Sequence, residues 1–142
     1  MNGQQSQNYL FIPYSYSASS GALNHGSSVT VPLLLDQDAD FELHEIFGGS
    51  SLDTATDPTF IRPLDFTFQV QDKTNGRLWS DAPMPGTVIA RVPGGWRMQR
   101  PVLLARRSNL SVMFTNVTSA SDGVVFYLNL LGHKVLAYTP GL

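Results

Sequence analysis

The residues whose spacing comes closest to a metal site are the alternating aspartates Asp36, Asp38 and Asp40. A D-x-D-x-D run opens the calcium loop of EF-hand proteins, where oxygen ligands from alternate positions converge on one ion. Such a loop needs a turn glycine at its sixth position and a bidentate glutamate at its twelfth, but these positions hold Phe41 and Phe47. We therefore interpret the run as a solvated loop between two strands.

The three histidines, His25, His44 and His133, are too widely spaced to form a recognisable metal motif. A zinc site needs three or four converging ligands, so we expect these histidines on the surface or at strand edges. The sequence has no G-x-S-x-G elbow and no Gly-rich phosphate loop after a strand. A pair of acids for glycoside cleavage would converge only in space, and nothing in the sequence selects one. We expect no enzymatic activity, no metal ion and no cofactor.

The segment 91–101, RVPGGWRMQRP, has the composition of a protein-binding surface. Trp and Arg are enriched in interface hot spots, and a Pro-Gly-Gly turn would present them outward. Trp96 can instead cap the end of a β-sandwich, or stack with the arginines on single-stranded nucleic acid. Seven of the nine basic residues are arginine, whose planar guanidinium suits protein interfaces. The candidate interface residues in this segment and just after it, up to residue 107, are Arg91, Trp96, Arg97, Arg100, Arg106 and Arg107.

Composition and charge argue against several classes of partner. The net charge of −2 and the pI of about 5.8 do not suit a protein that mainly grips nucleic acid phosphates. No apolar run approaches the ~20 residues of a membrane-spanning helix, and the first residues lack the basic and apolar regions of a secretory signal. We expect neither a nucleic acid nor a membrane partner. With no cysteine, the chain has no disulfide.

The two halves of the chain carry opposite charge. Residues 1–72 hold nine acidic residues and one basic residue, whereas residues 73–142 hold eight basic and two acidic ones. In a Greek-key sandwich early and late strands interleave, so these charges can neutralise one another within one subunit. Alternatively, an acidic and a basic patch meet an oppositely charged surface on a partner.

Alternation of apolar and polar residues dominates the sequence after residue 26 and predicts strands. The clearest cases are 64–71, 110–115 and 41–47, the last ending at Gly48-Gly49. Weaker candidates are 28–35, 77–80, 87–91 and 101–105, and the run 124–131 is apolar on both faces, as in a central strand. Asn75-Gly76 predicts a hairpin with a type I′ turn. The predicted fold is an all-β jelly-roll sandwich of about eight antiparallel strands, formed by residues 27–142 as one domain.

Residues 1–26 are rich in Gln, Asn, Ser, Tyr and Gly and are interpreted as an N-terminal arm. Such an arm can be a frayed terminus, or its aromatic residues can dock on a neighbouring subunit. The aromatic candidates are Tyr9, Phe11, Tyr14 and Tyr16.

Several segments between residues 60 and 136 stand together as a pattern. They are FTFQV at 66–70, DKTNGRL at 72–78, PMP at 83–85, RPVLL at 100–104, LSVMFTN at 110–116, and the run from Val124 to GHK at 132–134. This tract resembles the jelly-roll cement or decoration proteins of tailed bacteriophages.

The resemblance implies a non-enzymatic protein on the outer surface of a virion capsid. Its partners would be the major capsid protein and further copies of itself, as a homodimer or higher homo-oligomer. Three other readings stay open: a carbohydrate-binding β-sandwich, a tail or adsorption component of a virion, and a sandwich hydrolase with an unrecognised acid pair.

Overall fold

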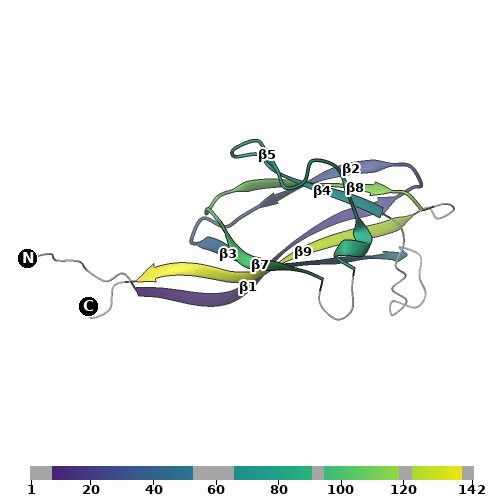
Figure 1. The fold of residues 1–142 in the computed structure, drawn as a ribbon. Helices are drawn as coiled ribbons and strands as arrows, with labels where there is room; N and C mark the ends of the chain where they lie inside the picture. The colour runs from purple at the N-terminus through teal and green to yellow at the C-terminus, as the bar shows by residue number, and fades with distance from the viewer. Residues whose placement is uncertain (1–7, 53–65, 91–94, 119–122, 139–142) are drawn as a thin grey trace, which may run out of the picture.

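The computed structural model describes residues 8–52, 66–90, 95–118 and 123–138. The described chain is almost entirely β-strand, arranged as two antiparallel sheets that pack face to face (Figure 1). The expectation of an all-β sandwich is confirmed. No helix among these residues is long and apolar enough to cross a membrane.

The sheets combine early and late strands of the chain. The first sheet has the order β1 (Asn8–Leu23), β9 (Val124–Tyr138), β3 (Asp40–Leu52) and β7 (Trp96–Leu104). The second has the order β2 (Ser28–Leu34), β8 (Asn109–Asn116), β4 (Phe66–Asp72) and β5 (Arg77–Leu78), and β6 (Met84–Pro85) also pairs with β4. β1 pairs with β9, β2 with β8, and β3 with β7. Residues far apart in the sequence are therefore direct neighbours.

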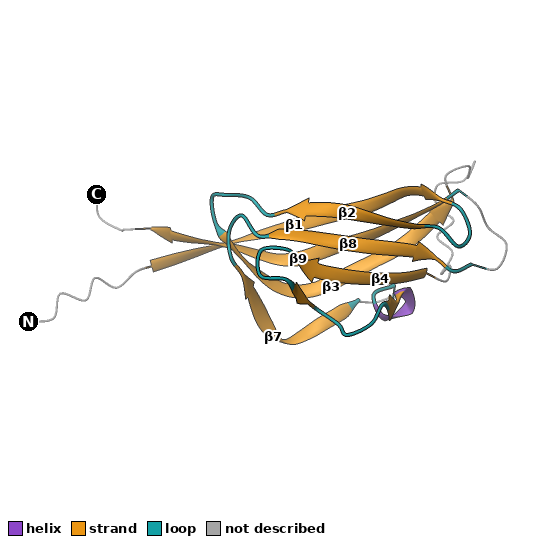
Figure 2. Cartoon of the chain, turned by 90° about the horizontal axis from the view of Figure 1, so that it is seen from above, coloured by secondary structure: helices purple, strands orange, loops and turns teal. Residues whose placement is uncertain are grey.

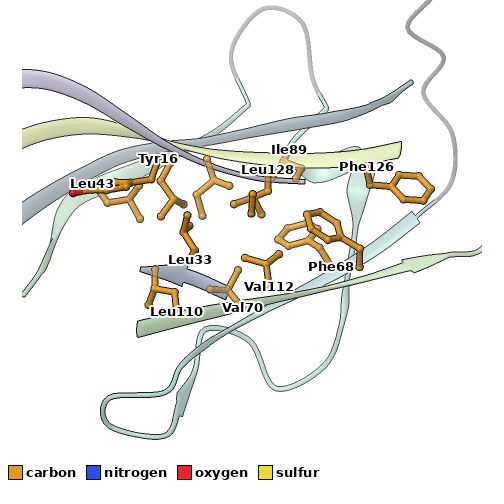
Figure 3. Packing of buried hydrophobic residues seen from close by; sticks show 14 of the residues in the cluster. Tyr16, Leu33, Leu43, Phe68, Val70, Ile89, Leu110, Val112, Phe126 and Leu128 are labelled. Atoms are coloured by element: carbon orange, nitrogen blue, oxygen red, sulfur yellow. The ribbon is translucent and has the colours of Figure 1, made fainter. Parts of the chain in front are cut away.

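The core lies between the sheets and follows from the alternation in the sequence (Figure 3). In β4 the odd-even pattern puts Phe66, Phe68 and Val70 inside, as predicted. β8 likewise buries Leu110, Val112 and Phe114. The apolar run at 124–131 belongs to β9, which lies between β1 and β3, so the prediction of a central strand is also confirmed.

One predicted strand and one predicted turn type are wrong, while the hairpin that contains the turn is confirmed. Residues 87–90 form no strand, because a 3-10 helix, η1 (Gly86–Val88), turns the chain and inserts Ile89 into the core. The Asn75-Gly76 hairpin forms between β4 and β5, but its turn spans four residues, 73–76. Gly76 takes a positive φ of 75° while Asn75 does not, as a type I′ turn would need. Asn75 Oδ1 instead accepts the N–H of Arg77 at 2.9 Å.

The predicted arm needs correction as well. Residues Asn8–Leu23 form a strand of 16 residues, and its second half belongs to the sandwich because Tyr16, Ala18 and Leu23 are buried in the core. The portion of 1–26 that can act as an arm is therefore shorter than expected.

The predicted end of the strand at Gly48-Gly49 is also wrong. β3 continues through these glycines to Leu52, since β9 pairs with it along that length.

Candidate functional site

One end of the β1–β9 pair extends beyond the rest of the sandwich as a two-stranded ribbon (Figures 1 and 2). β3 begins at Asp40, opposite Val135 of β9. Beyond Val135, β9 therefore pairs with β1 alone within the described chain. We call residues Tyr9–Ile12 and Val135–Ala137 the apolar ribbon. Its sequence on β1, YLFI, has no polar side chain apart from the tyrosine hydroxyl.

The apolar ribbon is exposed on both faces. Tyr9, Leu10 and Phe11 are 52%, 50% and 51% exposed. Because consecutive residues of a strand point to opposite sides, Leu10 lies on one face and Tyr9 and Phe11 on the other. A contiguous exposed apolar surface on a soluble domain marks a site of interaction. Within the part of the chain that the structure describes, β1 is also an edge strand of its sheet, with a strand neighbour on one side and none on the other.

Of the four predicted aromatic residues, Tyr9, Phe11 and Tyr14 are exposed but Tyr16 is not. Tyr16 is 6% exposed, and its ring packs edge-on against Tyr14 and Phe41 with centroids 5.0 Å away in each case. Its hydroxyl accepts the backbone N–H of Asp36 at 3.1 Å. Burial raises the pKa of this hydroxyl. Tyr16 thus holds β1 to the core and is not available to a partner, which corrects its assignment as a docking residue.

Where the ribbon joins the sandwich, Lys134 lies between two aspartates. Its Nζ donates to Asp36 Oδ2 at 2.8 Å and to Asp38 Oδ1 at 3.1 Å, and lies 4.1 Å from the centroid of the Tyr14 ring. Tyr14 also donates its hydroxyl to Asp36 Oδ2 at 3.1 Å. The hydrogen bond to Asp36 is the main reason that the pKa of Lys134 is raised well above its ordinary value. The same bond lowers the pKa of Asp36.

The aspartates that resembled a calcium loop are therefore partners of basic residues from the second half of the chain. Besides the Lys134 contacts, Asp40 Oδ1 accepts the backbone N–H of Arg106 at 2.9 Å and its Nε at 3.3 Å. For these three acids, neutralisation within one subunit is the correct interpretation of the charge asymmetry.

The predicted arginines are spread along β7 and the turn that follows it. Arg97 lies directly opposite Glu45 on β3, and Arg100 is exposed on the same strand. Arg107 is exposed in the β7–β8 turn with a left-handed φ of 62°. Arg106, as described above, pairs with Asp40. Arg91 lies outside the described residues.

Trp96 is half-buried and packs against the core instead of projecting outward. It lines an apolar hollow of about 320 Å³ at the β7 edge. The lining residues are Leu43, Ile46, Trp79, Trp96, Met98 and Val102. Trp96 therefore lies at the lateral β7 edge of the sandwich, and its role as a cap of one end stays a prediction.

The structure brings together a second group, which the sequence analysis missed. Glu42, His44 and His133 each offer a ligand atom, and these atoms all lie within 4.8 Å of one another. The sequence predicts His44 and His133 on the surface or at strand edges, because 89 positions separate them and no metal motif joins them. The antiparallel pairing of β3 with β9 places Glu42 opposite His133. No sequence motif predicts this pairing, because it depends on the register of β3 against β9.

Comparisons of the chain with protein-family models, with curated proteins and with solved structures give no match.

Proposed function

We propose that this chain is a non-enzymatic structural protein, a cement or decoration protein that binds the outside of a tailed-phage capsid. The observation that carries the proposal is the apolar ribbon, an exposed surface suited to contact with another protein. The resemblance of residues 60–136 to phage cement proteins supplies the capsid as the partner. The pairing of β1 with β9, β2 with β8 and β3 with β7 supports the jelly-roll form of the sandwich.

The size of the ribbon fits a protein that acts in many copies. Complete burial of an exposed Leu or Phe contributes about 1.5–3 kcal/mol. Tyr9, Leu10 and Phe11 are each about half exposed, so covering them would contribute about 2–4 kcal/mol. Association itself costs about 4–15 kcal/mol, so this contact alone would not hold an isolated pair of molecules. On a closed lattice each further contact becomes effectively intramolecular, and weak contacts sum to a stable coat.

The open edge of β1 gives the ribbon a second mode of contact. An extended segment of the major capsid protein, or β1 of a second copy, could add a strand there and satisfy main-chain groups, while the apolar side chains supply affinity. Pro13 lacks an N–H and interrupts such pairing near the sandwich, which favours contact at the ribbon end. The exposed Arg100, on the opposite edge of the same sheet, offers a charged contact that can orient the molecule on the shell.

The test is co-sedimentation with capsids that lack this protein, prepared from the phage that encodes it. Saturable binding in a fixed ratio to capsid subunits is expected. The variant Leu10→Thr/Phe11→Thr should bind at least tenfold more weakly, with its melting temperature nearly unchanged because both side chains are already half exposed.

The matched control is Leu34→Thr, which removes an exposed leucine on β2 in the other sheet and should bind as the wild type does. Arg100→Glu should also weaken binding, and it is a cleaner charge reversal than Arg97→Glu, which would place two acids opposite each other. Wild-type protein that does not bind capsids would refute the proposal, and binding to isolated tails instead would assign it to the tail.

A further inference from the structure

We infer that Glu42, His44 and His133 form a binding site for one divalent transition-metal ion on the outer face of the β1–β9–β3–β7 sheet. The inference is independent of the proposed function, since it concerns a different group of residues from the apolar ribbon.

The backbone places the three side chains on one face. Glu42 and His133 are directly opposite each other on β3 and β9, and cross-strand neighbours of this kind have Cβ atoms about 5 Å apart. Phe41 and Leu43 point into the core, so Glu42 between them points outward. On β9 the even positions Leu128, Leu130 and Lys134 are buried, so the odd position His133, which is half-buried, points outward.

His44 joins this pair because β3 has a bulge. Leu43 pairs with Gly132 and Glu45 with Leu131, which leaves His44 as an extra residue with no partner position on β9. A bulge redirects a side chain and often accompanies a functional site. Here His44 Nε2 lies 2.5 Å from Glu42 Oε1, and its ring meets that of His133 edge-on with centroids 5.0 Å apart.

Gly132 allows the strands to approach closely at this point. A Cβ at position 132 would collide with the backbone carbonyl of Glu42, so a side chain there would push β3 away from β9. The site is therefore held by two neighbouring strands of one sheet, at a position where only a glycine fits between them. Side chains carried on such paired strands are better fixed than those on loops.

Two imidazoles and one carboxylate are the donor set of many zinc sites with three protein ligands and an open fourth position. Imidazole nitrogen favours Zn²⁺ and its neighbours in the transition series, whereas Mg²⁺ and Ca²⁺ prefer oxygen ligands. The side chains of His44 and Glu42 are 41% and 27% exposed, so an ion can enter and water can complete its coordination. Leu103, opposite Glu42 on β7, and Pro13, opposite His133 on β1, give the site apolar neighbours.

The experiment uses the full chain without a polyhistidine tag and Zn²⁺ as the probe. Isothermal titration is expected to show one Zn²⁺ per chain, and thermal unfolding should shift upward with Zn²⁺ but not with Mg²⁺ or Ca²⁺ at the same concentration. His44→Gln, His133→Gln and Glu42→Gln should each weaken Zn²⁺ binding by about tenfold or more. The matched control is His25→Gln, because His25 is the third and last histidine of the chain and lies in the β1–β2 turn.

Circular dichroism without metal will show whether each variant is folded. A measurement on the wild type alone covers the case in which a variant does not fold: bound Zn²⁺ should protect His44 and His133, but not His25, from carbethoxylation. The inference would be overturned if Zn²⁺ binding did not saturate, or if His44→Gln and His133→Gln bound Zn²⁺ with wild-type affinity. Equal modification of all three histidines in the presence of Zn²⁺ would also overturn it.

Discussion

Replacing Lys134 by methionine tests whether the opposite charges of the two halves of the chain hold this sandwich together. Methionine keeps most of the apolar stem, which packs where the ribbon meets the core, and removes the ammonium group. The variant therefore isolates the contacts of Nζ with Asp36, Asp38 and the Tyr14 ring.

The burial of the three charged groups sets the expected size of the effect. Lys134 is only 8% exposed, and breaking an ion pair in which both groups are buried lowers the free energy of unfolding by ~3–5 kcal/mol. The side chains of Asp36 and Asp38, however, are 46% and 57% exposed, so both carboxylates regain water when the ammonium is absent. Solvent-exposed pairs contribute ~0–1 kcal/mol. We expect Lys134→Met to lower the free energy of unfolding by about 2 kcal/mol, between these limits, or roughly 6–8 °C in melting temperature for a domain of this size.

The pH dependence distinguishes the ion pairs from a simple packing defect. The pKa of Asp36 is lowered chiefly by its hydrogen bond with Lys134, so the stability gained from this contact is present above the ordinary aspartate pKa of about 3.9 and is lost as the pH falls below it. The pKa of Lys134 is raised, so the same stability is present below about pH 10.4 and is lost as the pH rises through the higher folded-state pKa. The difference between wild type and Lys134→Met should therefore shrink at both extremes.

Chemical denaturation of both proteins at about pH 3, 7 and 11 measures this difference. The comparison between pH 7 and pH 3 is easier to interpret than that between pH 7 and pH 11. The pKa of Tyr16 is raised by burial, so both proteins also lose stability above about pH 10 for this separate reason. Lys134→Leu is the matched control and should behave as Lys134→Met does. A difference in unfolding free energy that stays constant from pH 7 to pH 3 would show that packing, and not the charge, accounts for it.

Three further substitutions test the local structure. Gly132→Ala should cost more than ~2 kcal/mol in urea unfolding, because the added methyl group meets the carbonyl of Glu42; a neutral effect would mean that β3 and β9 separate easily. Arg107→Gly should raise the free energy of unfolding by about 1 kcal/mol or less, because a left-handed φ costs a side-chain-bearing residue about 1–2 kcal/mol and the greater chain entropy of glycine offsets part of this; a lower melting temperature would contradict this interpretation of the turn. Asn116→Ala should cost about 2–4 kcal/mol in denaturant titrations, since it leaves the buried Leu23 carbonyl and Thr118 N–H without the partners they now have at 2.9 Å and 3.0 Å; wild-type stability would show that water replaces the amide.

Period-two alternation was sufficient to predict the strands that contribute one face to the core. β4 is the clearest case, because it alternates without interruption, and β8 also buries Leu110, Val112 and Phe114 at alternate positions; both strands lie inside their sheet. The same reasoning failed at 87–90, where Val88 and Ile89 have high strand propensity. Ile89 is completely buried through a single turn of helix, so tertiary packing overrode local preference there.

The first strand shows how composition can hide a pattern. Tyr14, Tyr16 and Ala18 alternate with Ser15 and Ser17 just as the residues of β4 alternate. The surrounding Ser, Gln and Gly residues suggested an arm, yet Tyr16 and Ala18 face the core. The alternation was the better guide, because the direction of a side chain follows from backbone geometry whatever the polarity of the outward residues.

The Glu42–His44–His133 group could not be predicted in this way, because it depends on register. Alternation tells which face of β3 or β9 a residue occupies, but only the pairing of Glu42 with His133 fixes their separation. Sliding one strand by two residues would keep every core residue inside and carry His133 about 7 Å along the sheet, away from Glu42. Gly132 opposes that slide, because every other residue of β9 would bring a side chain against the Glu42 carbonyl. Gly48 of β3 opposes it too, because a Cβ there would collide with the Tyr127 carbonyl of β9. Both glycines favour the observed register of β3 on β9, and that register brings the two histidines and the glutamate together.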